Sequence, residues 1–162
     1  MKPRHISCTA APSSGFSLIE LMIALAIGAI LVAIAVPMYA KQVQHSRRVD
    51  ARTAVLDIAG REERYLSLQS SYTILPANLG YSATAVAFPM TVGSGYYTAN
   101  VTVVAGVPPN PPTYTVSATA IAGTSQAKDT QCQYFSVDST GKQFSSANIG
   151  GGGADTSAVC WQ

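Results

Sequence analysis

The residue with the clearest chemical consequence is Glu20, the last charged side chain before a long apolar stretch. Residues 21–40 read LMIALAIGAILVAIAVPMYA and contain no charged residue. If these residues form a helix, with a rise of about 1.5 Å per residue, the helix is long enough to cross about 30 Å of hydrocarbon. A carboxylate at the edge of hydrocarbon costs a few kcal/mol, so such residues are usually paired and functional. The sequence therefore predicts a membrane segment that begins at a functional carboxylate.

Catalytic and metal-binding sets are not discernible in the sequence. His5 lies near the N terminus, and His45 lies just past the apolar stretch, where we expect a solvated or subunit-contact residue. No Ser/His/Asp or paired-carboxylate arrangement is recognisable. Cys8, Cys132 and Cys160 include no CxxC and have no neighbouring histidine, which leaves too few ligands for zinc. We therefore expect a protein that is not an enzyme and that uses no metal or other cofactor.

Composition argues against an ordinary cytosolic protein. Of the 162 residues, 11% are charged and 48% are hydrophobic, whereas soluble domains have about 25% charged residues. Lys2 and Arg4 account for the net charge of +2, so the chain from residue 16 onward is neutral. Bulk charge therefore does not favour a polybasic surface for nucleic acid.

One long helix is predicted from Phe16 to about Ser70. At about 1.5 Å per residue it would measure roughly 80 Å. Pro37 removes a backbone donor and crowds the preceding turn, and Gly28 is a second weak point, so we expect a kink or local melting. Beyond the apolar stretch the helix becomes amphipathic, with apolar residues at roughly helical spacing: Ala51, Ala54, Val55, Ile58, Tyr65 and Leu68.

Arg47, Arg48 and Arg52 form a basic cluster in the amphipathic part of this helix. Such a cluster could contact anionic lipid headgroups before assembly, or acidic side chains of a neighbouring subunit. A solvated helix face is an equally good interpretation.

A small antiparallel sheet is predicted after a connecting region rich in glycine and proline at residues 72–95. Tyr96, Tyr97 and Tyr114 are expected to be core or strand-pair residues rather than a platform that stacks on DNA. A turn at residues 138–141 places Gly141 where a positive φ is needed, and the glycines at 150–153 indicate a flexible tail. The strand patterns lie at residues 96–104, 114–120, 132–137 and 142–145, with a proline-rich hairpin loop at 108–112.

The junction GFSLIE at residues 15–20 resembles the class III leader junction of type IV pilins and type II secretion pseudopilins. In those proteins a membrane aspartyl peptidase cuts after the glycine and methylates the new N-terminal phenylalanine, which implies cleavage between Gly15 and Phe16. A protease subsite that admits no Cβ would select glycine. The resemblance implies that Glu20 neutralises the methylated amine of Phe16 in a neighbouring subunit. The alternative is a glutamate that merely extends to the membrane interface.

Other segments carry the same resemblance into the rest of the chain. Cys132 and Cys160 match the pair that closes the C-terminal loop of pilin heads, where a disulfide would contribute about 3 kcal/mol; two free buried thiols are the alternative. Cys8 would be removed with the leader. Residues 59–72, residues 131–141 and the terminal Cys160-Trp161 resemble small minor pilins close to the major-pilin-like end of the family.

The resemblance implies an α+β type IV pilin fold, in which a long N-terminal helix packs on a small antiparallel sheet. Residues 1–15 would be a cleaved leader, 16–40 the transmembrane and fibre-core helix, 41–71 its amphipathic half, and 72–162 the head. The expected function is that of a structural minor pilin. Before assembly, the subunit would be anchored in the lipid bilayer of the bacterial inner membrane with its head in the periplasm. It would then join an extracellular pilus.

Its expected partners are prepilin peptidase, the inner-membrane assembly platform and other pilin subunits, in a homopolymer or a heteropolymer. The fibre could serve pilus biogenesis, twitching motility, adhesion or DNA uptake. One alternative is a type II secretion pseudopilin, whose heads often bind calcium through clustered acids, whereas Asp129, Asp138 and Asp155 lie far apart here. Another is a pilin whose head binds DNA or a surface. Residues 73–162 carry only Lys128 and Lys142 against three acids, so nucleic acid is not the favoured ligand.

Overall fold

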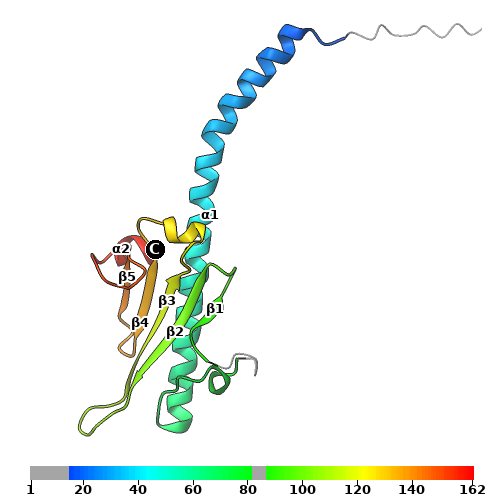
Figure 1. The fold of residues 1–162 in the computed structure, drawn as a ribbon. Helices are drawn as coiled ribbons and strands as arrows, with labels where there is room; N and C mark the ends of the chain where they lie inside the picture. Colours follow the sequence, from blue (N-terminus) through cyan, green and yellow to red (C-terminus); the bar gives the residue numbers. More distant parts are fainter. Residues whose placement is uncertain (1–14, 82–86) are drawn as a thin grey trace, which may run out of the picture. The chain divides into compact units, whose positions relative to one another are not determined.

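The structure is a computed structural model, and it describes residues 15–81 and 87–162 (Figure 1). Most of the predicted leader, including Lys2, Arg4, His5 and Cys8, lies outside the described residues. The chain divides into two compact units, residues 1–39 and 40–162.

The long helix α1 spans Leu18–Gln69, close to the predicted range. Its N-terminal part is exposed along nearly its whole length and includes an 18-residue window with a mean hydropathy of 2.7. By length and composition, this helix could cross a membrane. The helix is uninterrupted at Gly28 and Pro37, so the expected local melting does not occur. A kink at these residues stays a prediction.

The amphipathic part of α1 contributes one stripe to the core of the second unit. Ala51, Val55 and Ile58 are buried, as their spacing predicts. Tyr65 packs against this core. The prediction is wrong for Leu68, which is 74% exposed because it lies in the last turn of α1, where it lines a surface pocket instead of the core.

Five antiparallel strands form one sheet in the order β1-β2-β3-β4-β5. The four predicted strands are confirmed, and the predicted α+β pilin fold with them. The short β1 and the 3-10 helix η1, Pro76–Leu79, fall in the region predicted to be only a connecting loop, because three or four residues carry too little periodicity to be recognised. The strands are β1 Met90–Val92, β2 Tyr97–Val104, β3 Thr113–Ala120, β4 Tyr134–Asp138 and β5 Gln143–Ser146.

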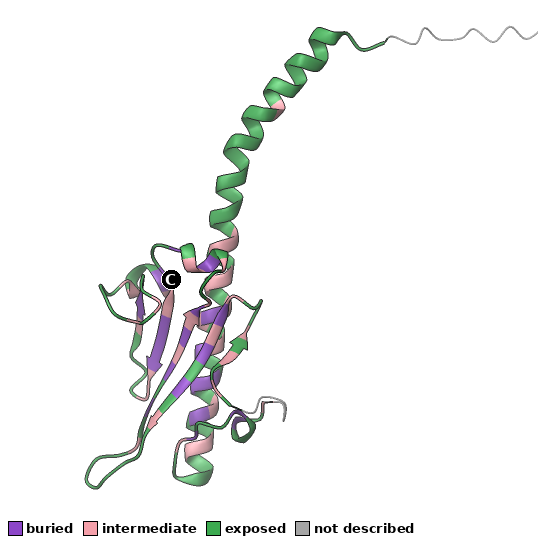
Figure 2. Cartoon of the chain, in the orientation of Figure 1, coloured by how far each residue is buried: buried purple, intermediate pink, exposed green. Residues whose placement is uncertain are grey.

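One face of the sheet is buried together with the helix stripe (Figure 2). The pairs Ala99–Ala118 and Ala118–Phe135 lie across neighbouring strands on this face, and each of these side chains is fully buried. Tyr97 and Tyr114 are also buried, which confirms that they are core residues. In β2 and β3, more buried residues alternate with less buried ones at the period of two that a half-buried strand requires.

The predicted turn at the β4–β5 hairpin is confirmed. Gly141 has a φ of +79°, and its N–H donates to the carbonyl oxygen of Asp138 at 2.9 Å. Two further segments complete the unit: the 3-10 helix η2, Ser125–Lys128, and the one-turn helix α2, Ser157–Cys160.

Candidate functional site

The residues predicted for leader cleavage and assembly lie together in one short accessible stretch. Gly15 has no atom within 4 Å of the position that a Cβ would occupy, and Phe16 is 84% exposed. Leu21 donates its N–H to the carbonyl oxygen of Ser17 at 3.2 Å, which starts the hydrogen bonding of α1. Glu20 lies in the first turn, where the positive end of the helix dipole favours a carboxylate.

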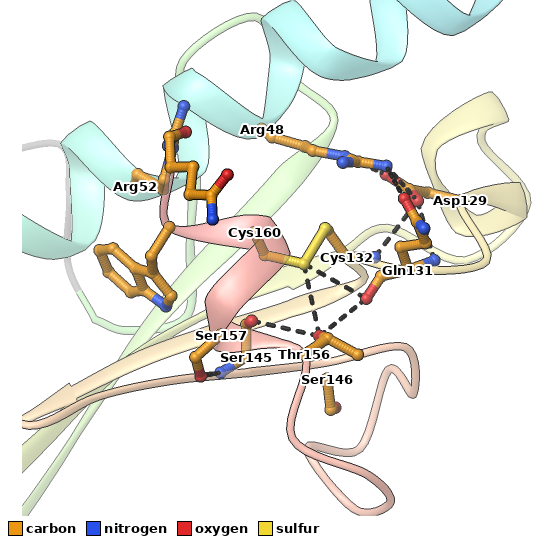
Figure 3. The surroundings of a disulfide bond; sticks show 12 residues. Arg48, Arg52, Asp129, Gln131, Cys132, Ser145, Ser146, Thr156, Ser157 and Cys160 are labelled. Carbon is orange, nitrogen blue, oxygen red and sulfur yellow. Dashed lines mark hydrogen bonds and ion pairs between the residues drawn. A yellow bond between two sulfur atoms is a disulfide. The ribbon is translucent and has the colours of Figure 1, made fainter.

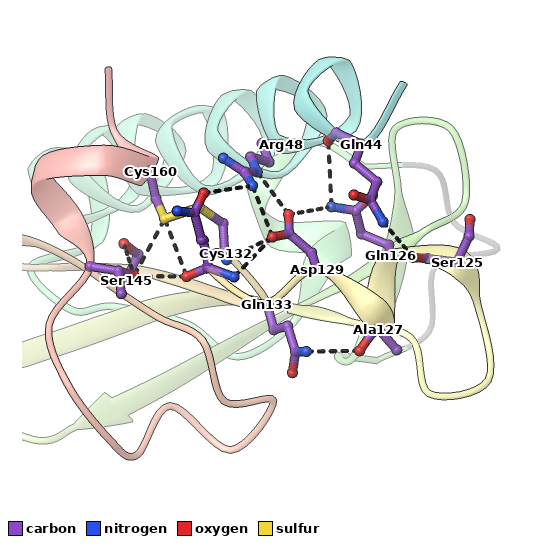
Figure 4. Close-up of polar contacts among 12 residues, drawn as sticks. Gln44, Arg48, Ser125, Gln126, Ala127, Asp129, Cys132, Gln133, Ser145 and Cys160 are labelled. Atoms are coloured by element: carbon purple, nitrogen blue, oxygen red, sulfur yellow. Dashed lines mark hydrogen bonds and ion pairs between the residues drawn. A yellow bond between two sulfur atoms is a disulfide. The ribbon is translucent and has the colours of Figure 1, made fainter. Parts of the chain in front are cut away.

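On the head, Arg48 of α1 forms a bidentate ion pair with Asp129 (Figure 4). Its Nε lies 2.7 Å from Oδ2 and its Nη2 lies 2.8 Å from Oδ1. The two side chains are 12% and 2% exposed. Oδ1 of Asp129 also accepts the backbone N–H groups of Gln131 and Cys132, at 3.0 and 3.2 Å. The pair therefore joins the helix directly to the segment that carries the first cysteine of the head.

A buried polar network extends from this ion pair. Gln126 donates its Nε2 to the Tyr97 hydroxyl at 2.9 Å and to Asp129 Oδ2 at 3.1 Å. The Tyr97 hydroxyl in turn donates to the carbonyl oxygen of Cys132 at 2.9 Å. Burial raises the pKa of Tyr97 well above its ordinary value, so the hydroxyl keeps its proton as a donor. This network fixes the backbone position of Cys132.

The predicted Cys132–Cys160 disulfide is confirmed (Figure 3). Its Cα atoms lie 5.8 Å apart, and both cysteines are buried. Next to it, Trp161 donates its indole N–H to the carbonyl oxygen of Phe144 at 3.2 Å, and its ring lies 5.8 Å from that of Phe135. The disulfide and the tryptophan together hold the C-terminal segment on the sheet.

The predicted basic cluster on α1 does not form a free cationic surface. Besides the Arg48 ion pair, the Arg47 guanidinium lies 3.4 Å from the centre of the Tyr96 ring and donates to the Ser125 hydroxyl at 2.6 Å. Arg52 donates to the backbone oxygen of Gln162. Each arginine contacts another part of the head, although the hydrogen bonds of Arg47 and Arg52 are exposed. Sequence reasoning missed these contacts because the partners lie 45 or more residues away along the chain. A contact of this cluster with lipid or with a neighbouring subunit stays a prediction.

A second cationic feature is a surface pocket of about 200 Å³ at the C-terminal end of α1. Arg61 is held in place, since its Nε lies 2.9 Å from Asp57 Oδ2 and its Nη1 donates to the carbonyl oxygen of Leu79 at 2.9 Å. The Arg64 guanidinium makes no hydrogen bond or ion pair with any other residue in the described part of the chain, whereas its carbonyl oxygen accepts the Ser67 hydroxyl at 2.7 Å. The pocket is lined by Arg61, Arg64, Tyr65, Leu68, Asn78, Leu79 and Gly80.

This pocket can accept an anionic group. The Tyr65 hydroxyl accepts a hydrogen bond from Asn78 Nδ2 at 3.4 Å, so its own proton is available to donate. The guanidinium of Arg64 supplies further donors in a planar fork that suits carboxylate or phosphate oxygens. The charge count over residues 73–162 overlooked this feature, because both arginines belong to α1 although they lie in the same unit as the sheet.

Comparisons with known families agree with both parts of the chain. Residues 11–36 match a family model described as "Prokaryotic N-terminal methylation motif", a range that includes Gly15, Phe16 and Glu20. Residues 37–136 match a family model described as "Type IV minor pilin ComP, DNA uptake sequence receptor". No curated protein matches this chain. Because the second match extends over more than half of the chain, from the amphipathic half of α1 through β3 into β4, the chain belongs to the type IV minor pilin ComP family.

Proposed function

We propose that this minor pilin takes part in DNA uptake and that its head contacts DNA. The observation that carries the proposal is the match of residues 37–136 to a family described as a DNA uptake sequence receptor. Bulk charge alone does not favour nucleic acid, so the proposal also needs a local cationic site. The pocket of Arg61 and Arg64 supplies one.

Phosphate contacts fit the chemistry of this pocket. Arginine binds phosphate oxygens with two parallel N–H donors, and most protein–DNA hydrogen bonds go to the sugar-phosphate backbone. Arg64 is the better candidate, because Arg61 is already engaged by Asp57 and by the carbonyl of Leu79. With so few available cations, binding should be weak and strongly dependent on salt.

The proposal includes processing and assembly through the N-terminal stretch. Prepilin peptidase would cut between Gly15 and Phe16 and methylate Phe16; the motif match and the exposure of both residues support this. Before assembly the apolar part of α1 would lie in the inner membrane with the head in the periplasm, a compartment whose oxidising chemistry suits the disulfide. Through the assembly platform it would then join other pilin subunits in the pilus.

In the fibre, the apolar helices would exchange lipid contacts for contacts with one another. A buried, unpaired Glu20 would be costly there, so its pairing with the amine of a neighbouring Phe16 would also set the axial register of the subunits. The pseudopilin alternative is not favoured, because the matched family is that of a pilus minor pilin. Asp129 is moreover paired with Arg48, and the described part of the chain contains no group of three or more potential metal ligands.

The test uses the full mature chain in detergent micelles and a pool of random-sequence DNA duplexes. We expect retention of DNA at low salt, and enrichment of particular sequences after repeated selection if the chain is a sequence receptor. Arg64→Ala should weaken retention. Lys142→Ala is the matched control, since Lys142 is an exposed cation on the β4–β5 turn, outside the pocket. DNA binding that is absent at low salt, or equal losses in both variants, would contradict the proposed site.

A further inference from the structure

Glu62 is a carboxylate in the core of the head. Its side chain is fully buried on α1, in the same stripe as Ile58 and Ala59. Oε2 accepts the backbone N–H of Thr73 at 3.1 Å, whereas Oε1 has no hydrogen-bond partner among the described residues. Burying an ionised carboxylate is costly unless it is paired and fully hydrogen-bonded.

Among the residues that the structure describes, the titratable groups that face Glu62 carry no positive charge. Glu63 follows it on α1, Tyr72 faces it from the segment after the helix, and Tyr114 faces it from β3. The Tyr72 hydroxyl donates to Glu63 Oε1 at 3.2 Å, and the rings of Tyr72 and Tyr114 lie 4.6 Å apart. Burial above all, and then the charge of Glu63, raise the pKa of Glu62, although the hydrogen bond from Thr73 opposes them. The closed structure therefore favours the neutral carboxyl.

Residues 71–75, which we call the cover segment, close over this carboxyl. Thr73 is buried, and its hydroxyl accepts the N–H of Leu75 at 3.1 Å and Nδ2 of Asn78 at 3.0 Å. Ile74 and Leu75 are instead 57% and 48% exposed, so Tyr72 makes the main apolar contact between the cover segment and the core. Its hydrogen bond to Glu62 is a single backbone N–H.

We propose that Glu62 is a proton-operated latch for the cover segment: the neutral carboxyl keeps residues 71–75 closed on α1, and the ionised carboxylate opens them by drawing in water. The closed state binds the proton of Glu62 more tightly than the open state does. The stabilisation of the closed state by this proton is therefore fully present below the ordinary carboxyl pKa of about 4.5 and is lost as the pH rises through the raised pKa of the closed head. Each pKa unit between the two states changes the open population up to about tenfold.

Opening of the cover segment would also change the pocket of Arg61 and Arg64. The functional meaning of this change rests on the proposed function. Thr73 contacts Asn78, and Asn78 lines the pocket with Arg61 and Arg64. Loss of the Thr73 contact would free the Asn78 amide, so the pocket would be best ordered at mildly acidic pH.

The test is hydrogen exchange, read by mass spectrometry, of the mature full-length chain in detergent micelles between pH 4.5 and 8. Rates are expressed as protection factors, so that the intrinsic pH dependence of exchange cancels. Protection of peptides that include Thr73 should fall severalfold as the pH rises. Glu62→Gln, which is neutral and of equal size, should stay protected throughout. Glu63→Gln removes the neighbouring charge that helps to raise the pKa of Glu62, so the fall in protection should remain but should occur at a lower pH.

Equal protection of the wild type at pH 4.5 and 8 would overturn the latch, as would an unaltered pH dependence in Glu62→Gln. The wild-type measurement decides the question even if Glu62→Gln does not fold. Retention of a random duplex pool at the same pH values separates the two proposals. If neither the wild type nor Glu62→Gln binds DNA at any pH, the proposed function fails. The exchange data still decide whether the latch exists.

Discussion

Arg48 and Asp129 are 81 positions apart in the sequence and form a bidentate ion pair that is almost entirely withdrawn from solvent. The pair joins α1 to the backbone just before Cys132. The backbone N–H of Cys132 also donates to Asp129. The helix is therefore fastened to the disulfide-bonded part of the head by a charged contact as well as by the apolar core. This contact, unlike a surface salt bridge, should matter for stability.

Removing one partner of this pair should strongly destabilise the head. Arg48→Ala leaves Asp129 buried without its cation, a change that typically costs about 3–5 kcal/mol. Trp161 is the only tryptophan, and it packs in the head, so its fluorescence reports thermal unfolding of the mature chain in detergent micelles. Lys41→Ala, at an exposed position on the same helix, is the control and should leave the melting temperature unchanged. A similar small effect of both variants would show that the pair contributes little.

Opening the disulfide should destabilise the head to a comparable degree without affecting processing. Cys160→Ser releases a bridge between residues 28 positions apart, which should lower the free energy of unfolding by about 3 kcal/mol. The leader junction belongs to the other compact unit, so cleavage should proceed normally. Melting by tryptophan fluorescence and the mass of the membrane-bound chain measure the two effects. Unchanged melting and protease resistance would show that the bridge is not formed in the protein.

Periodicity and turn chemistry explain how much of this fold is predictable from sequence. The stripe of Ala51, Val55 and Ile58 and the strand that contains Tyr97 follow from local spacing, and Gly141 follows from the turn that it must make. The contacts of Arg48 do not follow from local spacing, because its partner Asp129 is brought close only by the complete fold. Arg64 illustrates the same point for the site: a charge count along the chain ignores which element carries each cation.

A glycine at the turn between β1 and β2 should be required by close packing against α1. A Cβ at Gly93 would lie 2.5 Å from the Cβ of Asp50, and the φ of Gly93 is +57°. Asp50 Oδ2 accepts the N–H of Ser94 at 3.1 Å, so the turn cannot move away without losing this contact. Gly95→Ala is a matched control, since its φ is +87° but no atom lies within 4 Å of its Cβ position.

Each substitution should lower the free energy of unfolding by about 1 kcal/mol, because alanine disfavours the left-handed backbone. Only Gly93→Ala should lower it further through the clash with Asp50. Melting temperatures of the two variants test this difference. Equal melting would mean that the turn adjusts freely and that the contact with Asp50 is dispensable.

Processing should depend on the small size of Gly15. Gly15→Leu adds a side chain at the residue that the peptidase subsite would have to accept without a Cβ, so the full-length precursor should accumulate in the membrane. Immunoblotting of membrane fractions distinguishes precursor from mature chain by size. Efficient cleavage of Gly15→Leu would contradict the assignment of the leader junction.

Assembly should depend on the charge of Glu20. Glu20→Val removes the cost of placing a carboxylate at the membrane, so insertion and leader cleavage should be at least as efficient as in the wild type. Entry into the fibre should fail, because the amine of Phe16 on the adjacent subunit would have no counter-charge, and an unpaired buried charge costs about 3–5 kcal/mol. Glu20→Asp keeps the charge with about one methylene less reach, so its incorporation should be intermediate.

The measurement is the ratio of this chain in sheared fibres to its level in the membrane, for the wild type and both variants. Equal membrane levels with a depleted fibre fraction for Glu20→Val separate an assembly defect from an insertion defect. Recovery of Glu20→Val from fibres at the wild-type ratio would reduce Glu20 to a carboxylate that extends to the membrane interface. Graded incorporation, with wild type above Glu20→Asp and Glu20→Asp above Glu20→Val, would instead mean that both the charge and its position act in the fibre, as pairing with the amine of Phe16 requires.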